Sequence, residues 1–143
     1  MPYQYLDDIA TADAAFKAWG ETLEELFTAA AEATMNVMVA DLATIAPEQQ
    51  RYFSVEADAV DMLLFELLQE IIFYKDAEQL LLRVAEVQIS GGDDLWSLNA
   101  TAVGETLNME KHELVVDVKA VTLHRFQVEK TDHGWEALVI LDI

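Results

Sequence analysis

Two segments with helical periodicity, each preceded by a segment that alternates like a strand, set the main limit on the fold. The first begins at Thr22-Leu23-Glu24-Glu25, which has the form of a capping box, because Thr22 can cap the helix and Glu25 can reach back. Apolar residues and one threonine then follow at three- and four-residue spacing: Leu23, Leu26, Phe27, Ala30, Thr34, Val37 and Met38. This spacing predicts an amphipathic helix, and the alternating segment from Ala14 to Trp19 predicts a strand that Gly20 ends.

The second helical segment repeats this arrangement. Arg51 to Ala57 alternates as a strand, and Asp58 can cap the helix that follows. The apolar stripe of that helix is wide and contains Leu63, Leu64, Leu67, Leu68, Ile71, Ile72 and Tyr74. We therefore expect a second helix with one broad buried face.

The remainder of the chain has the composition of strands. Leu81 to Ser90 and Trp96 to Val103 predict a hairpin around a turn at Gly91-Gly92-Asp93-Asp94. Val115 to Val128 is mostly apolar or β-branched and predicts one long or bulged strand. A final strand is expected to return antiparallel from Trp135. The order of elements predicts an α+β fold, with two helices packed on a largely antiparallel (mixed) β-sheet.

The length of 143 residues predicts a single domain, residues 1–143, that is large enough to bury a core. Hydrophobic residues make up 53% of the chain, which excludes global disorder. No cysteine is present, so disulfides and thiolate chemistry are excluded. The first residues lack a signal peptide and the apolar stretch from Val60 to Tyr74 contains three acids, so we expect a cytoplasmic protein without membrane contact.

The formal net charge of −19 arises from 27 acidic and 8 basic residues. Tight nucleic-acid binding depends on lysine and arginine side chains that neutralise phosphates, so we expect no direct binding of RNA or DNA. A basic protein partner or a cation fits this charge better, and adaptation to salt or simple solubility is the alternative explanation.

The apolar strand from Trp135 to Leu141 leads into Asp142 and Ile143. A side-chain carboxylate and an α-carboxylate are then expected one residue apart on a buried strand. Such an arrangement is costly unless a positive group compensates it, and the candidates are a cation, a lysine or a partner protein.

Other acids could join this pair. Asp7, Asp8 and Asp13 lie just before the first predicted strand, and Asp13 would approach Asp142 if the first and last strands lie side by side. An all-oxygen set of this kind suits Ca²⁺ or Mg²⁺, although most of the 27 acids are expected to be simply solvated. Lys119, inside an apolar segment, could point to solvent or neutralise a buried carboxylate.

Catalytic motifs are missing. The sequence has no phosphate-binding glycine loop, no nucleophile elbow and no zinc-type histidine pair. Paired acids could serve a hydrolase, but no nucleophile or oxyanion donor accompanies them. Glu105 is either an ordinary loop acid or part of the acidic site, and His124 and His133 are best explained by packing or solvation.

Several ordered blocks together make the chain similar to the archease family. The matching residues are Thr11-Ala12-Asp13, Ala18-Trp19-Gly20, Thr22-Leu23-Glu24-Glu25, Glu70, Gly104-Glu105, His112, Val118-Lys119-Ala120-Val121-Thr122 and Val139-Ile140-Leu141-Asp142-Ile143. The resemblance covers essentially the whole chain. One departure is that the family's Asp-His-Thr-Ala-Asp opening has no histidine here, where Asp7-Asp8-Ile9-Ala10-Thr11 stands with two inserted residues.

The resemblance implies a non-enzymatic helper. Archeases activate a GTP- and Mn²⁺-dependent RNA ligase that joins a 3′-phosphate or 2′,3′-cyclic phosphate to a 5′-hydroxyl in tRNA splicing and RNA repair. They promote guanylylation of the ligase and multiple turnover. The alternative function that the resemblance implies is chaperone-like modulation of the oligomeric state and specificity of a tRNA methyltransferase.

The resemblance also implies site residues. Asp13, Asp142 and the carboxylate of Ile143 correspond to the family's divalent-metal ligands, with calcium as the expected ion and magnesium or manganese as alternatives. Glu105, Lys119 and His112 correspond to positions associated with activation of the partner.

Overall fold

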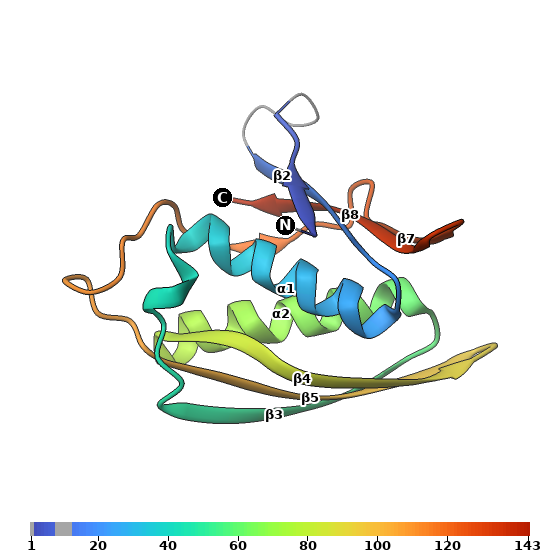
Figure 1. The fold of residues 1–143 in the computed structure, drawn as a ribbon, viewed down its shortest axis with the longest axis horizontal. Coiled ribbons are helices and arrows are strands. Elements are labelled where there is room, and N and C mark those ends of the chain that lie inside the picture. Colours follow the sequence, from blue (N-terminus) through green and yellow to red (C-terminus); the bar gives the residue numbers. More distant parts are fainter. Residues whose placement is uncertain (1, 8–12) are drawn as a thin grey trace.

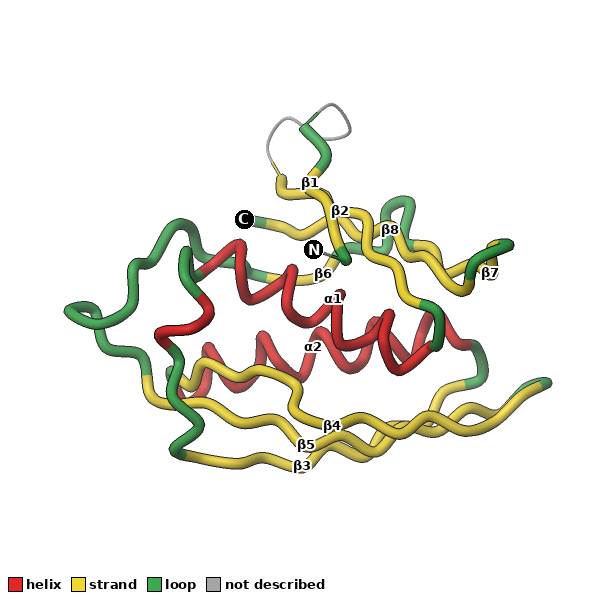
Figure 2. The backbone as a smooth tube through the Cα atoms, in the orientation of Figure 1, coloured by secondary structure: helices red, strands yellow, loops and turns green. Residues whose placement is uncertain are grey.

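The computed structural model describes residues 2–7 and 13–143. Within this described part, two α-helices lie between two antiparallel sheets (Figures 1 and 2). The elements are β1 (Tyr3–Tyr5), β2 (Asp13–Gly20), α1 (Leu23–Met38), the 3₁₀ helix η1 (Leu42–Thr44), β3 (Gln49–Ala57), α2 (Val60–Glu78), β4 (Leu80–Gly92), β5 (Leu95–Thr106), β6 (Ala120–Val121), β7 (Gln127–Thr131) and β8 (Gly134–Asp142). The predicted α+β class is confirmed, and the strands divide into two sheets.

The first sheet is built around β8, which pairs with β2 on one side and with both β6 and β7 on the other. β1 extends this sheet beyond β2. Because side chains alternate along a strand, Phe16 and Val139 face the helices together, and both are fully buried. Burying a phenylalanine side chain of this kind contributes roughly 1.5–3 kcal/mol.

The second sheet has the order β3-β5-β4 and covers the opposite side of the helices. The predicted hairpin of β4 and β5 is confirmed, and its turn lies at Asp93 and Asp94. Asp93 has φ 53°, in the left-handed region that aspartate tolerates better than most residues. The close approach of β5 to β4 also requires Gly104, because a Cβ there would lie 1.6 Å from the Leu81 carbonyl oxygen.

The capping box of α1 is confirmed. The Thr22 hydroxyl accepts the Glu25 backbone N–H at 3.1 Å, while Glu25 accepts the backbone N–H groups of Glu21 and Thr22. The alanines of α1, among them Ala29, Ala30 and Ala33, are buried. Their small side chains let this helix pack closely against its neighbours.

The predicted cap of α2 is wrong. The N-cap residue is Ala59, which makes no side-chain capping bond, so Asp58 lies one position too early. Asp61 does lie in the first turn, and its negative charge interacts favourably with the positive N-terminal end of the helix dipole.

The long or bulged strand predicted from Val115 to Val128 is also wrong. Only Ala120–Val121 and Gln127–Thr131 form strand within and just beyond this segment. Val118 and Val121 face the core, whereas Val115 and Leu123 are exposed, and Arg125 has φ 56°. Most of the segment is therefore loop, and only some of its apolar residues lie in paired strands.

No helix in the part of the chain that the structure describes is long and apolar enough to cross a membrane.

Candidate functional site: an acidic strand end and a buried carboxylate cluster

Asp13 and Asp142 lie opposite each other at the end of the β2–β8 ladder. Directly opposed residues of antiparallel strands share one face of the sheet, with Cβ atoms about 4.5–5.5 Å apart. Both side chains are half-buried. Among the described residues, neither carboxylate takes part in an ion pair, so two like charges face each other without protein compensation. This arrangement favours a cation from outside the chain.

Ile143 follows Asp142 directly and packs partly against the core. The Asp142 carbonyl accepts the backbone N–H of Lys119 at 2.8 Å, which holds Lys119 beside the acidic strand end. The Lys119 side chain is exposed and makes no ion pair with the residues that the structure describes. Of the two alternatives for Lys119, the structure therefore agrees with the one that points it to solvent.

The remaining predicted acids lie apart or outside the described residues. Asp7 follows β1 and is exposed, and Asp8 lies outside the described residues. Within residues 2–7 and 13–143, no three histidine, aspartate or glutamate side chains are grouped closely enough to hold a metal. The Asp13 and Asp142 carboxylates offer the oxygen chemistry that Ca²⁺ prefers, but Ca²⁺ takes about 6–8 oxygens, so two side chains alone do not form a complete site.

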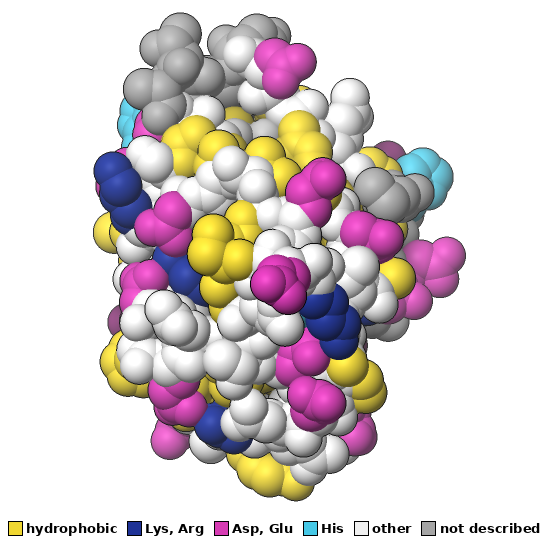
Figure 3. Space-filling model, turned by 90° about the vertical axis from the view of Figure 1, so that its left-hand side faces the viewer, with side chains coloured by type: hydrophobic (Ala, Val, Ile, Leu, Met, Phe, Trp, Pro, Cys, Tyr) yellow, Lys and Arg dark blue, Asp and Glu magenta, His cyan; other side chains and the backbone are white. Residues whose placement is uncertain are grey.

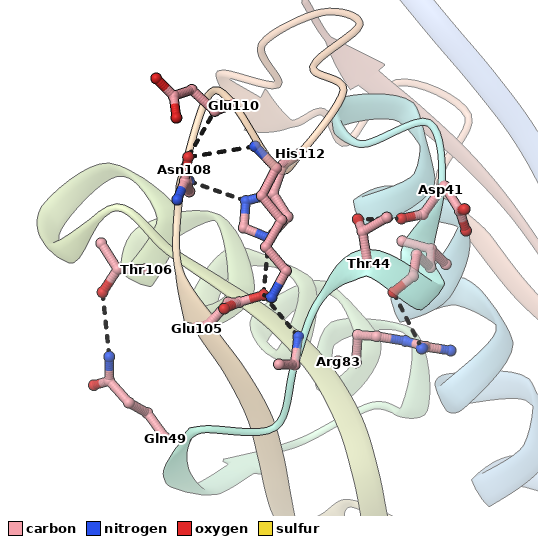
Figure 4. Close-up of polar contacts among 12 residues, drawn as sticks. Asp41, Thr44, Gln49, Arg83, Glu105, Thr106, Asn108, Glu110 and His112 are labelled. Carbon is pink, nitrogen blue, oxygen red and sulfur yellow. Dashed lines mark hydrogen bonds and ion pairs between the residues drawn. The ribbon is translucent and has the colours of Figure 1, made fainter.

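A second polar cluster surrounds Glu105, at the end of β5 (Figure 4). One carboxylate oxygen of this nearly buried side chain accepts three hydrogen bonds. The donors are the Ala46 backbone N–H at 2.8 Å, the Lys111 ammonium at 2.7 Å and His112 Nε2 at 2.9 Å. The Ala46 N–H, followed by the Lys111 ammonium, lowers the pKa of Glu105 to about 2 against the opposing effect of burial. Glu105 therefore remains ionised at neutral pH.

His112 is fixed as a hydrogen-bond donor in this cluster. Its side chain is fully buried, and Nδ1 accepts the Asn108 backbone N–H at 2.9 Å. A nitrogen that accepts cannot carry a proton, so the proton lies on Nε2 and is donated to Glu105. This tautomer gives His112 no free nitrogen to act as a base, and the cluster serves to anchor residues 107–119, the β5–β6 loop.

The structure thus separates the predicted residues into two groups. Glu105 and His112 come together at the end of the second sheet, whereas Asp13, Asp142 and Lys119 meet at the end of the first. The β5–β6 loop connects the two groups along one end of the molecule (Figure 1).

Lys75 was missed from the sequence. It lies on α2, is 8% exposed, and its ammonium contacts the Asp117 carboxylate at 2.5 Å and the Val118 carbonyl at 2.7 Å. Burial lowers its pKa, but the hydrogen bonds from Lys75 to Asp117 and Asp76 outweigh this effect and raise the pKa overall. The sequence does contain a sign of its burial. Lys75 lies four residues after Ile71, on the apolar face of the predicted helix, where a solvated lysine is not expected.

Comparison with known proteins gives consistent matches over the whole chain. The model of the Archease protein family matches residues 3–143. A protein named archease from Thermococcus kodakarensis is 37% identical over 134 residues, covering 93% of this chain and 94% of the relative. A protein of the same name from Methanopyrus kandleri is 32% identical and covers 100% of both chains.

Solved structures match as well. The solution structure of Methanobacterium thermoautotrophicum protein 1598 has a TM-score of 0.85 at 35% identity, covering 99% of each chain. The crystal structure of a Thermotoga maritima protein, described as an archease and possible chaperone, has a TM-score of 0.60 at 18% identity, covering 94% of this chain and 93% of that one. The latter likeness concerns the fold alone.

Proposed function

Because the chain belongs to the archease family, we propose that it is a non-enzymatic activator of a GTP- and Mn²⁺-dependent RNA ligase. In this role it promotes guanylylation of the ligase and multiple turnover in tRNA splicing or RNA repair. The partner is a protein, and the chain does not bind the RNA itself.

The observation that carries this proposal is the opposed pair Asp13 and Asp142 at one strand end. β8 pairs with strands on both sides, so the two carboxylates are held on a rigid support. Rigidly placed carboxylates can position a metal ion or orient a histidine in a partner's active site, which is a contribution of geometry and electrostatics.

The charge distribution supports docking on a basic cleft. Figure 3 shows the end of the molecule that carries the β5–β6 loop, where acidic side chains are spread over the face and lysine or arginine side chains are isolated. An RNA-binding cleft must be positive to hold phosphates. A surface of opposite sign accelerates and orients such docking.

We also propose that Asp13, Asp142 and the Ile143 carboxylate bind a divalent cation, with calcium as the expected ion and magnesium or manganese as alternatives. When bound, the ion would supply the positive charge that the opposed carboxylates lack. The oxygen-only donor set supports this choice over a soft metal.

A purified ligase assay tests the proposal. Asp13→Asn and Asp142→Asn should each strongly reduce stimulation of ligase guanylylation, because the amide oxygen can still face a cation but the negative charge is lost. Asp132→Asn, in the exposed turn between β7 and β8, is the matched control and should stimulate like the wild type. Full stimulation by both site variants would show that the carboxylates do not act in this way.

The alternative, a chaperone-like modulator of a tRNA methyltransferase, draws on one observation. The β5–β6 loop exposes large apolar side chains, with Met109 at 77% and Val115 at 58% exposed. Exposed apolar groups of this kind are typical of protein contact surfaces. A short C-terminal extension discriminates the two functions, because it displaces the Ile143 carboxylate and should disable the activator while leaving the modulator nearly unchanged.

A further inference from the structure

A groove of about 1550 Å³ runs along α1, on the side of that helix which neither sheet covers. One wall comes from the first sheet and includes Tyr3, Trp19 and Trp135, while the other wall comes from β4 and includes Val87. α1 forms the floor between these walls, as its place between the two sheets in Figures 1 and 2 indicates.

The groove is distinct from the acidic strand end. Along the β2–β8 ladder, Gly20 pairs with Trp135 at one end, and Asp13 pairs with Asp142 at the other. The tryptophans of the groove therefore lie at the opposite end of the same two strands. A ligand in the groove would not need Asp13 or Asp142.

The lining of the groove is strongly negative. Seven of its described side chains are aspartate or glutamate, and Arg83 is the only lysine or arginine among them. Arg83 is already engaged, because its Nε donates to the Glu32 carboxylate at 3.0 Å and its Nη1 donates to the Leu42 carbonyl. Glu136 is paired with the Lys17 ammonium at 3.3 Å. The other carboxylates of the lining, such as Glu21 and Glu86, have no cation partner among the described residues.

The wall formed by β4 is a strand edge with which no other strand of the described residues pairs, and the Glu24 side chain occupies one of its backbone donors. β4 is the last strand of the second sheet, and the Ile89 backbone N–H points away from β5 to reach the Glu24 carboxylate at 3.2 Å. Backbone groups of alternate residues in a strand point to the same side, so the N–H and C=O of Val87 also face the groove. An open edge of this kind can pair with an added extended segment.

The opposite wall can accept cationic side chains. Trp19 is 39% exposed and Trp135 is half-buried. Lys130 already places its ammonium 5.9 Å from the centre of the Trp135 ring, within cation–π range. Aromatic rings therefore stand across the groove from the open strand edge.

We propose that this groove binds an extended, lysine- and arginine-rich segment of a partner protein, which lies along α1 and pairs with the edge of β4. Alternating basic and apolar side chains would meet the carboxylates and the tryptophans in turn. A second copy of this chain is disfavoured as the occupant, because each copy carries a net charge of −19. Peptide binding in the groove does not require ligase activation.

Titration of the full chain with a short synthetic peptide of alternating lysine and valine tests the proposal. Amide NMR shifts should change at Val87 and Ile89, and the indole signals of Trp19 and Trp135 should change with them. A peptide of alternating glutamate and valine should produce no shifts. A lysine–valine peptide with N-methylated backbone at alternate residues should bind more weakly, and unchanged binding would overturn strand pairing.

Charge-reversal variants distinguish peptide binding in the groove from a general effect of the protein's net charge. Glu21→Lys/Glu86→Lys should weaken binding of the lysine–valine peptide about tenfold, which is 1.4 kcal/mol. Glu56→Lys/Glu66→Lys makes the same charge change at exposed residues outside the groove and should have little effect. Equal weakening in both variants would overturn the proposal, as would self-association of the wild type that is lost in the Glu21→Lys/Glu86→Lys variant.

Discussion

The ammonium of Lys75 on α2 lies 2.5 Å from the carboxylate of Asp117 in the β5–β6 loop. The same ammonium holds the Val118 carbonyl, and the next residue, Lys119, donates its backbone N–H to Asp142. One buried side chain therefore connects the core helix to the loop that reaches the acidic strand end. The two residues that precede Lys119 are thereby held against α2.

Replacing Lys75 by methionine should lower the free energy of unfolding by roughly 1–2 kcal/mol. Hydrogen bonds to charged groups are lost, but Asp117 is largely exposed and is re-solvated, which limits the cost. Urea unfolding followed by circular dichroism measures the change. Lys17→Met, which breaks the exposed pair with Glu136, is the matched control and should cost less than about 1 kcal/mol. Equal losses would show that Lys75 has no special anchoring role.

Glu105 should make stability depend on pH in the acid range. Its pKa is about 2 in the folded protein, against 4.5 for an ordinary glutamate, so its stabilising contribution is present above about pH 4.5 and is lost as the pH falls toward 2. Glu105→Gln should therefore be less stable than the wild type at neutral pH and lose less stability on acidification. Urea midpoints across this range measure both effects, with exposed Glu56→Gln as the control. Parallel pH curves for wild type and Glu105→Gln would contradict the prediction.

His112 should keep its Nδ1 unprotonated as a fixed acceptor. Because Nδ1 accepts the Asn108 N–H, ¹⁵N-edited NMR of the ring should show a protonated Nε2 and an unprotonated Nδ1. His124 and His133 are exposed and should exchange between tautomers, which provides an internal reference. A proton on Nδ1 of His112 would show that this nitrogen does not accept the Asn108 N–H, and an Nε2 without a proton would show that the ring does not donate to Glu105.

Asp13→Asn should have opposite effects with and without a divalent cation. In EDTA the variant should be more stable by about 0.5 kcal/mol, because two opposed like charges become one. With added Ca²⁺ the wild type should gain stability through ligand binding and the variant should gain less. Thermal unfolding in the two conditions measures this difference. Stabilisation by Ca²⁺ that is equal in both proteins would place the ion elsewhere.

Local signals in the sequence predicted the local structure well. Thr22 and Glu25 act within one turn, so the capping box could be read directly and is confirmed. Asp58 does not cap α2, because the helix begins at Val60 and its N-cap residue is therefore Ala59. The exact start of a helix depends on its packing, which the local sequence does not reveal. The segment from Val115 failed because apolar content alone does not say which residues face the core.

The arrangement of the candidate site was predicted only in part: Asp13 was expected to approach Asp142 if their strands are neighbours, and the β2–β8 pairing meets that condition. Asp13, Asp142, Glu105 and His112 were all named, but cross-strand pairing decides which of them meet, and that pairing depends on contacts between distant parts of the chain. Lys75 was overlooked because its partner, Asp117, lies in a segment expected to be strand. The division into two sheets could not be predicted either, since it depends on which helix face each strand covers.

The central place of β8 determines when the first sheet can form. β2, β6 and β7 all pair with β8, which follows every one of them in the sequence. During synthesis on the ribosome, these strands emerge before the strand with which they pair. β2 can pair with β8 only after the more than one hundred residues between them have been made. The second sheet is assembled from neighbouring segments, and its β4–β5 hairpin closes locally. We therefore expect the second sheet to form first and the two carboxylates of the acidic strand end to meet only in the last step of folding.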